Sequence, residues 1–292
     1  MRPIRQLLIV LGVLALTSGA ALAQGQTQPP WWRVSDGRTE VWILGAPRIA
    51  PRDFSWDTSV AEKRLSQAQS VIVGPRARNS LNAAGLVFAS LSSEPLEPSL
   101  PPALRQRFVA ARQAVGKSAQ RYSGWKPAAA SKFLIDDFFQ ANNLQQGAVE
   151  AAMVKLAHAH GVHDVPAGEF SSQELFDEAK ALGQAQQLTC LDASVHDVER
   201  GAGVIRQVAQ GWAHGGVTDD PIDPIDQACV AEFPAIGAQA QRTLAQESDA
   251  VIRAVGGQQR VVAVFELHSL TQPGGVLDRL RAHGLQVTGP HS

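Results

Sequence analysis

Apolar residues near the start of the chain form short runs typical of strands. Residues 32–34 and 41–44 are rich in aromatic and β-branched side chains, and the loop between them contains Asp36-Gly37. An Asp-Gly pair between two such runs is a strong signal for a β-hairpin. Residues 57–69 then have helical spacing and lead into a short apolar strand at 70–73, which Gly74-Pro75 ends.

The middle of the chain has mainly helical periodicity. Helical spacing covers residues 102–115, 128–160, 187–212 and 236–255. Gly161 stands where a glycine would end the second of these segments. A short strand-like segment at 162–168 follows, and Ser171-Ser172-Gln173-Glu174 has the pattern of a capping box for the next helix.

Strand patterns return at the end of the chain. Residues 260–265 form a continuous apolar run, 273–275 a turn, 276–283 a short helix that Gly284 ends, and 285–288 a last strand. Strands at both ends with helices between them predict an α/β protein. We expect a split α/β fold, in which N- and C-terminal strands form a central mixed sheet around a helical middle section.

Four tryptophans lie in or beside the predicted hairpin: Trp31, Trp32, Trp42 and Trp56. Aromatic side chains bury a large area, and strands offer them a core to fill. We therefore predict that they form the core of the opening hairpin rather than a platform for a ligand.

The first 23 residues have the features of a secretory signal peptide. Arg2 and Arg5 precede an apolar segment at 7–16, and Ala21-Leu22-Ala23 fits a signal peptidase site. The apolar segment is shorter than the roughly 20 residues that a spanning helix needs. We predict cleavage after Ala23, a linker at 24–29, one domain at 30–292, and a periplasmic or secreted protein without a stable membrane span; an uncleaved anchor is the alternative.

The charge of the chain bears on its binding partners, and its cysteine content bears on disulfide formation. The 26 basic and 27 acidic residues give a net charge of −1, and they are interspersed, which argues against a nucleic-acid partner. Cys190 and Cys229 are the two cysteines. An even number in an exported chain allows a disulfide, and two buried thiols are the alternative.

Distinctive segments lie at both ends of the chain: residues 30–37, 41–45 and Trp56 at the start, and 261–264, His268, 273–277 and 280–287 at the end. In this order they resemble the TraB/GumN family, whose relatives include Tiki-type metalloproteases and, more distantly, erythromycin esterase and ChaN-like proteins. Weaker matches lie between them, at Trp125-Lys126-Pro127, Gly168-Glu169, Gly211-Trp212 and Arg242. The resemblance implies a TraB/GumN-like fold over nearly the whole domain.

The family site that this resemblance implies contains two Gly-x-x-His motifs and a glutamate, each at the end of a strand. Such residues hold a divalent cation that activates water and polarises a carbonyl. Here the first motif ends in Arg48, Gly74 stands at the glutamate position, and Phe265 replaces the glycine of the second motif, which keeps His268. Arginine stays protonated and has no lone pair for a metal.

These departures predict a catalytically degenerate family member, a pseudoenzyme scaffold that acts as a binding or regulatory module and needs no cofactor. His268, Glu169 and Arg242 are the remnant catalytic candidates, and His268 is the remaining metal ligand. The alternative is an active metal-dependent peptidase or hydrolase with a site rebuilt around His268, using Mn, Co or Zn. In a strand, Glu266 would share a face with His268 and could serve as the substitute carboxylate.

Arg48, Arg242 and Glu169 are candidate ligand-binding residues. If they converge with His268, two guanidinium groups would form a pocket for a small anion or for the carboxylate of a peptide. The alternative is a relic ion pair of Glu169 with Arg242 or Arg48.

Overall fold

The computed structural model describes residues 28–78, 90–218 and 224–290. The predicted signal peptide, and all of the predicted linker except residues 28 and 29, lie outside the described residues. Across the described ranges, every helix is too short or too polar to cross a membrane.

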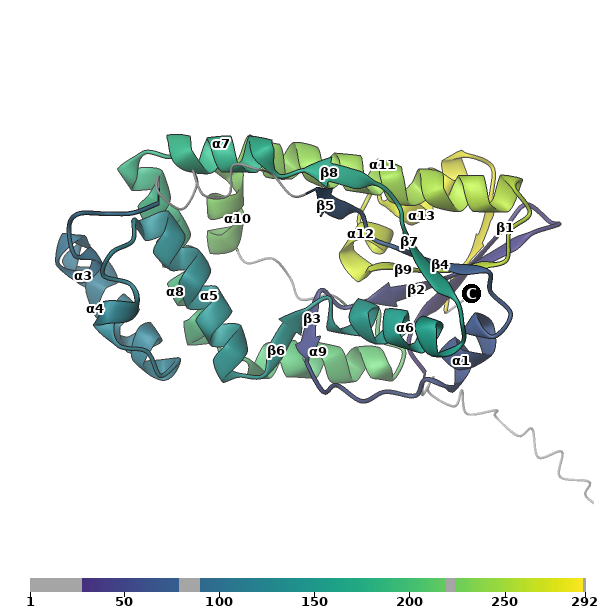
Figure 1. Ribbon diagram of the computed structural model, residues 1–292, viewed down its shortest axis with the longest axis horizontal. Helices are drawn as coiled ribbons and strands as arrows, with labels where there is room; N and C mark the ends of the chain where they lie inside the picture. Colours follow the sequence, from purple (N-terminus) through teal and green to yellow (C-terminus); the bar gives the residue numbers. More distant parts are fainter. Residues whose placement is uncertain (1–27, 79–89, 219–223, 291–292) are drawn as a thin grey trace, which may run out of the picture.

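A six-stranded mixed sheet forms one end of the molecule (Figure 1). In spatial order its strands are β10 (Gln286–Thr288), β1 (Trp31–Ser35), β2 (Glu40–Ala46), β9 (Val261–Glu266), β4 (Ser70–Val73) and β7 (His163–Pro166). β1 is antiparallel to both of its neighbours, whereas β2, β9, β4 and β7 are parallel. The predicted α/β class and the mixed sheet from both ends of the chain are confirmed, with β7 added from the middle.

β9 lies between β2 and β4, and five of its six residues are buried, which explains its unbroken apolar sequence. Helices cover the sheet (Figure 1). α1 (Ser59–Leu65) and α6 (Ala148–Ala159) pack together beside β4 and β9, and α11 (Pro234–Gly256) packs with α13 (Val276–Ala282). α12 (Leu267–Thr271) directly follows β9 and contacts β2.

Most of the other helices form the opposite end of the molecule, around a second apolar core (Figure 1). They are α3 (Leu96–Ser99), α4 (Pro102–Ala114), α5 (Pro127–Ala141), α8 (Gln184–Arg200) and α10 (Pro224–Ala231), with the short 3₁₀ helix η1 (Ala119–Arg121). The connecting elements are β3 (Ile49–Pro51), β5 (Arg76–Arg78), β6 (Leu144–Gln146), β8 (Glu169–Ser171), α7 (Gln173–Ala181) and α9 (Gly203–Ala213). β3 pairs with β6, and β5 with β8.

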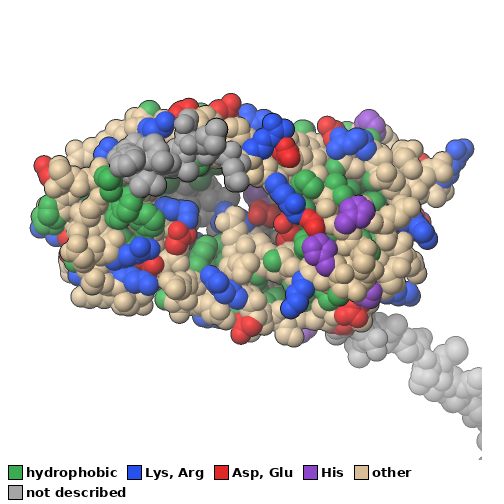
Figure 2. All heavy atoms as spheres, viewed as in Figure 1, with side chains coloured by type: hydrophobic (Ala, Val, Ile, Leu, Met, Phe, Trp, Pro, Cys, Tyr) green, Lys and Arg blue, Asp and Glu red, His purple; other side chains and the backbone are tan. Residues whose placement is uncertain are grey.

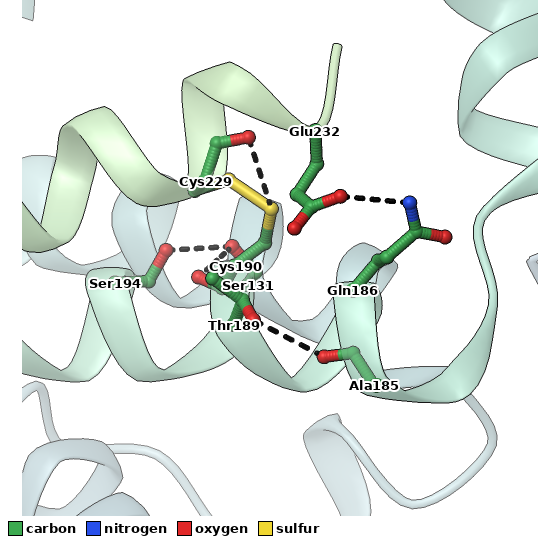
Figure 3. The surroundings of a disulfide bond; sticks show 8 residues. All are labelled: Ser131, Ala185, Gln186, Thr189, Cys190, Ser194, Cys229 and Glu232. Carbon is green, nitrogen blue, oxygen red and sulfur yellow. Dashed lines mark hydrogen bonds between the residues drawn. A yellow bond between two sulfur atoms is a disulfide. The ribbon is translucent and has the colours of Figure 1, made fainter.

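A disulfide joins α8 to α10 in this helical end (Figure 3). The Sγ atoms of Cys190 and Cys229 are 2.03 Å apart. Beside the bond, the buried Ser131 hydroxyl from α5 donates to the carbonyl of Cys190 and lies 2.6 Å from the hydroxyl of Ser194. The predicted disulfide is confirmed, and the alternative of two free thiols is wrong.

Two of the predicted long helical segments are interrupted. The segment 128–160 divides into α5, β6 and α6, and the backbone takes positive φ at Asn143 (54°) and Gly147 (67°). The segment 187–212 divides at Gly201 (φ 76°) into α8 and α9. Helical residues do not have positive φ, so these positions end a helix even where the apolar spacing continues. Gly161 (φ 74°) follows α6 as predicted.

Candidate functional site

The carboxyl ends of β2, β9 and β4 meet at one edge of the sheet, which faces the helical end of the molecule (Figure 1). Ala46 at the end of β2 is in register with Glu266 at the end of β9, and Gly74 follows β4. This is the edge where open α/β sheets place their ligands. It is also where the family resemblance places its metal site.

Gly74 lies against two carboxylates that come from helices. A Cβ atom on Gly74 would be 3.5 Å from Oε2 of Glu150 and 3.8 Å from Oε1 of Glu247. The backbone N–H of Gly74 donates to the same Glu150 oxygen at 3.3 Å. α6 and α11 therefore supply carboxylates beside the position where the resemblance expects a glutamate side chain from β4.

Glu247 is the most unusual group at this edge. Its side chain is buried, with 2% of the residue exposed, and its Oε2 has no hydrogen-bond partner within residues 28–78, 90–218 and 224–290. Burial, followed by the charges of Glu266 and Glu150, raises the pKa of Glu247 to about 8. The carboxyl group therefore keeps its proton at neutral pH.

The two neighbouring glutamates are more accessible. Glu150 is partly buried, and burial raises its pKa, while the Gly74 N–H and the charge of Arg76 oppose this shift. Glu266 is also partly exposed and lies at the N-cap of α12. Figure 2 shows acidic side chains in a hollow near the centre of one face, between the sheet and the helical end. We call Glu150, Glu247 and Glu266 the acidic triad.

His268 is exposed on α12, which begins at Leu267. The prediction that Glu266 and His268 share one face of a strand is wrong, because β9 ends at Glu266 and the chain turns directly into a helix. In a helix, residues two apart do not face the same side.

Arg48 lies in the turn between β2 and β3 and lines a cavity whose wall does not include the acidic triad. The cavity has a volume of about 240 Å³, and Lys132, Asp136, Asp197 and Arg200 also line it. Lys132 pairs with Asp136 at 2.5 Å and Arg200 with Asp197 at 3.7 Å, so most of the charge in this cavity is paired within the protein.

Glu169 and Arg242 have other partners. Glu169 on β8 pairs with Arg78 on the neighbouring β5, and Arg242 on α11 pairs with Glu174 on α7 at 3.0 Å. The predicted relic ion pair of Glu169 with Arg242 or Arg48 is wrong. No hydrogen bond or ion pair joins any two of Arg48, Glu169, Arg242 and His268, all of which belong to the described ranges.

Two residues of the family resemblance have a packing role. A Cβ atom on Gly45 would lie 2.5 Å from the Trp32 ring and 2.8 Å from Leu267, so only glycine fits between β1 and α12. The buried Trp212 donates its indole N–H to the carbonyl of Gly45 and packs edge-on against Trp56, with ring centroids 5.3 Å apart. Of the four tryptophans predicted to form the core, Trp31 and Trp32 are buried, and Trp42 and Trp56 are partly buried and pack against it.

The donor set does not fit the divalent metal that the resemblance implies. Arg48 and Gly74 offer no ligand atom from a side chain, and His268 lies on a helix outside the strand. Among the described residues, no three His, Cys, Asp or Glu side chains are arranged to hold a metal ion.

Glu150 and Glu247 distinguish this edge, but neither was predicted from the sequence to be a site residue. Glu247 shares the buried face of α11 with Leu244, Val251 and Ala254, at spacings of three, four and seven residues. A lone glutamate on an apolar helix face was the available signal. Glu150 similarly lies beside Val149 at the start of an apolar helix.

The fold and this edge together define an α/β protein with an acidic site beyond the carboxyl ends of its parallel strands. A model of the TraB/PrgY/gumN family matches residues 30–289, and the chain belongs to this family. Comparisons with curated proteins and with solved structures gave no match.

Proposed function

We propose that the protein is an exported, catalytically degenerate member of its family that binds a cationic organic group at the acidic triad. The observation that supports this most is Glu247, a buried carboxyl whose Oε2 has no hydrogen-bond partner among the described residues, placed at the edge where α/β proteins receive ligands. The replacements Arg48, Gly74 and Phe265 support the loss of the family chemistry.

The chemistry of the site favours an ammonium or guanidinium group, from a small amine or from a basic side chain of a peptide. Three carboxyl groups repel an anion, and a cation would stabilise the ionised form of Glu247. Binding would then release the proton that Glu247 keeps in the free protein. Affinity should therefore rise as the pH increases toward about 8.

The test is calorimetric titration of the purified protein with 1,4-diaminobutane at pH 6 and pH 8.5. We expect tighter binding at the higher pH and a loss of about tenfold or more in the Glu247→Gln variant, which cannot ionise. Glu94→Gln changes an exposed glutamate in the helical end and is the matched control. Equal affinity at both pH values, or in Glu247→Gln, would contradict the proposal.

A metal-dependent peptidase or hydrolase with a rebuilt site is the second candidate. It is supported by the position of Glu150 and Glu247 beside Gly74, where they could replace the missing family glutamate. A fluorogenic peptide assay with added Mn²⁺, Co²⁺ or Zn²⁺ distinguishes the two. Turnover that depends on the metal and disappears in Glu247→Gln would replace the binding proposal.

Export is part of the proposal and rests on the sequence of residues 1–23. Expression of the full chain and N-terminal sequencing of the product test it. We expect the product to begin at Gln24 and to appear outside the cytoplasm. A product that still begins at Met1 would contradict it.

A further inference from the structure

A second cavity, of about 440 Å³, lies at the opposite edge of the sheet from the acidic triad. It opens where β2 and β9 begin and where α1 ends, and its wall includes Arg38, Trp42, Arg64 and Arg260. The volume is within the range of small-molecule sites. Because β2 and β9 are parallel, this edge cannot share a ligand with their carboxyl ends.

Arg64 forms the inner part of this cavity. Its guanidinium carbon lies 4.1 Å from the ring centroid of Trp31 and 3.8 Å from that of Trp42, so both rings contact the cation. Burial lowers the pKa of Arg64 to about 10, and its Nη1 is buried without a hydrogen-bond partner in the part of the chain that the structure describes. The rings fix the guanidinium in place and leave part of its donor capacity unused.

Two further guanidinium groups border the same cavity. Arg38 in the hairpin loop and Arg260 before β9 are exposed, and neither makes an ion pair with another residue that the structure describes. The only carboxylate in the described wall is Glu40, which pairs with Arg33. Three cationic groups thus face one cavity, and the one acidic side chain there already has a partner.

We propose that this cavity binds a small organic oxyanion through a phosphate or carboxylate group. Guanidinium groups form paired, charge-assisted hydrogen bonds with both kinds of oxyanion. Arg64 would supply the preorganised donor, and the exposed Arg38 and Arg260 would donate further hydrogen bonds to the anion. The proposal concerns a different edge and different residues from the acidic triad, so it stands or fails independently of the proposed function.

The test uses the full purified protein and three probes at constant ionic strength: inorganic phosphate, citrate and sodium chloride. Constant ionic strength removes general screening of surface charge. Thermal unfolding reports binding because a ligand of the native state raises its stability. We expect phosphate or citrate to raise the unfolding temperature in a saturable way and chloride to leave it unchanged.

The double variant Arg38→Gln/Arg260→Gln removes the two exposed arginines and leaves the core intact. We expect its dissociation constant for the bound probe to rise about tenfold or more. Arg206→Gln, an exposed arginine on α9, is the control and should bind like the parent. Stabilisation by phosphate alone, or by citrate alone, supports the proposal and identifies the group; no stabilisation, or equal binding by the double variant, overturns it.

Discussion

The two edges of the central sheet carry side chains of opposite type, and each has one ionisable residue without an oppositely charged partner among the described residues: the buried Glu247 and the partly buried Arg64. The carboxyl edge has the acidic triad around Glu247, and the amino edge has Arg64 between two tryptophan rings. Glu247 has a raised pKa of about 8, whereas Arg64 has a lowered pKa of about 10. Burial disfavours the charged form in both.

Glu247 and Arg64 respond differently to the free-energy cost of removing a charge from water. A carboxyl group can bind a proton and become neutral, so Glu247 loses its charge at neutral pH. A guanidinium with a pKa of about 10 stays charged at that pH, so Arg64 depends on the faces of Trp31 and Trp42. The acidic edge is therefore sensitive to pH near neutrality, and the basic edge is not.

The ends of α6 and α1 favour the opposite charges found at the two edges of the sheet. Glu150 lies in the first turn of α6, and Arg64 lies in the last turn of α1. The partial positive charge at a helix N-terminus stabilises an anion, and the partial negative charge at a C-terminus stabilises a cation. Both side chains therefore occupy the helix end that favours their charge.

Among the substitutions considered, Glu247→Gln should change the free energy of unfolding the most. Glu247 in the folded protein keeps its proton up to about pH 8, whereas in the unfolded chain it loses the proton near its ordinary pKa of 4.5. The folded state then loses stability as the pH rises from 4.5 to 8, and glutamine, which resembles the protonated form, removes this loss. We expect a gain of roughly 2 to 4 kcal/mol at pH 8 and almost none at pH 4.5.

Urea unfolding of parent and variant between pH 4.5 and pH 8.5 measures this difference. Glu94→Gln should reproduce the parent profile. A Glu247→Gln profile parallel to that of the parent would show that Glu247 is ionised in the folded protein.

The substitution Gly74→Glu should have the next largest effect on the free energy of unfolding. The new side chain would enter the space beside Glu150 and Glu247 and add a further carboxyl group to the acidic triad. We expect Gly74→Glu to destabilise the protein by about 2 kcal/mol at pH 8 and by less at pH 5, because burial raises the pKa of carboxyl groups at this edge and more of them are protonated at the lower pH.

The control variant Gly74→Ala distinguishes the effect of the added charge from the effect of the added side-chain volume. An alanine Cβ would have ordinary van der Waals contacts at 3.5 and 3.8 Å, so we expect a change within about 0.5 kcal/mol. Thermal unfolding at both pH values measures the pair. Equal losses in both variants would show that steric contact, and not charge, limits this position.

Much of the fold could be predicted because its signals are local. Asp36-Gly37 between two apolar runs indicated the hairpin, and the unbroken run at 260–265 indicated the buried strand β9. The break after α5 was missed because positive φ at Asn143 has no counterpart in apolar spacing. The pattern records which face is buried, and it does not record where the backbone leaves the helix.

The site was harder to predict because its residues come from distant segments. Gly74 appeared to be a missing ligand, but Glu150 and Glu247 lie 76 and 173 positions later in the sequence and approach it only in the folded protein. Substitutions at family positions are visible one by one. Carboxyl groups that other helices bring to the same place become visible only in the folded structure.

Replacement of Arg64 by lysine should have a smaller effect than either change at the acidic edge. Lysine keeps the charge but cannot place a planar group against Trp31 and Trp42. We expect Arg64→Lys to lower the free energy of unfolding by about 1 kcal/mol, and to change tryptophan fluorescence. Lys63→Arg, at the exposed neighbouring position, is the control, and a fluorescence spectrum unchanged in Arg64→Lys would contradict the stacking argument.

His268 should matter least, although it is the family residue that the sequence preserves. It is exposed on α12, so His268→Ala should change stability by less than about 0.5 kcal/mol and leave the affinity for 1,4-diaminobutane unaltered. Thermal unfolding with Mn²⁺, Co²⁺ or Zn²⁺ completes the comparison. Stabilisation of the parent by one of these metals, abolished in His268→Ala, would show that His268 and the acidic triad form a metal site and would overturn the division between the two edges proposed above.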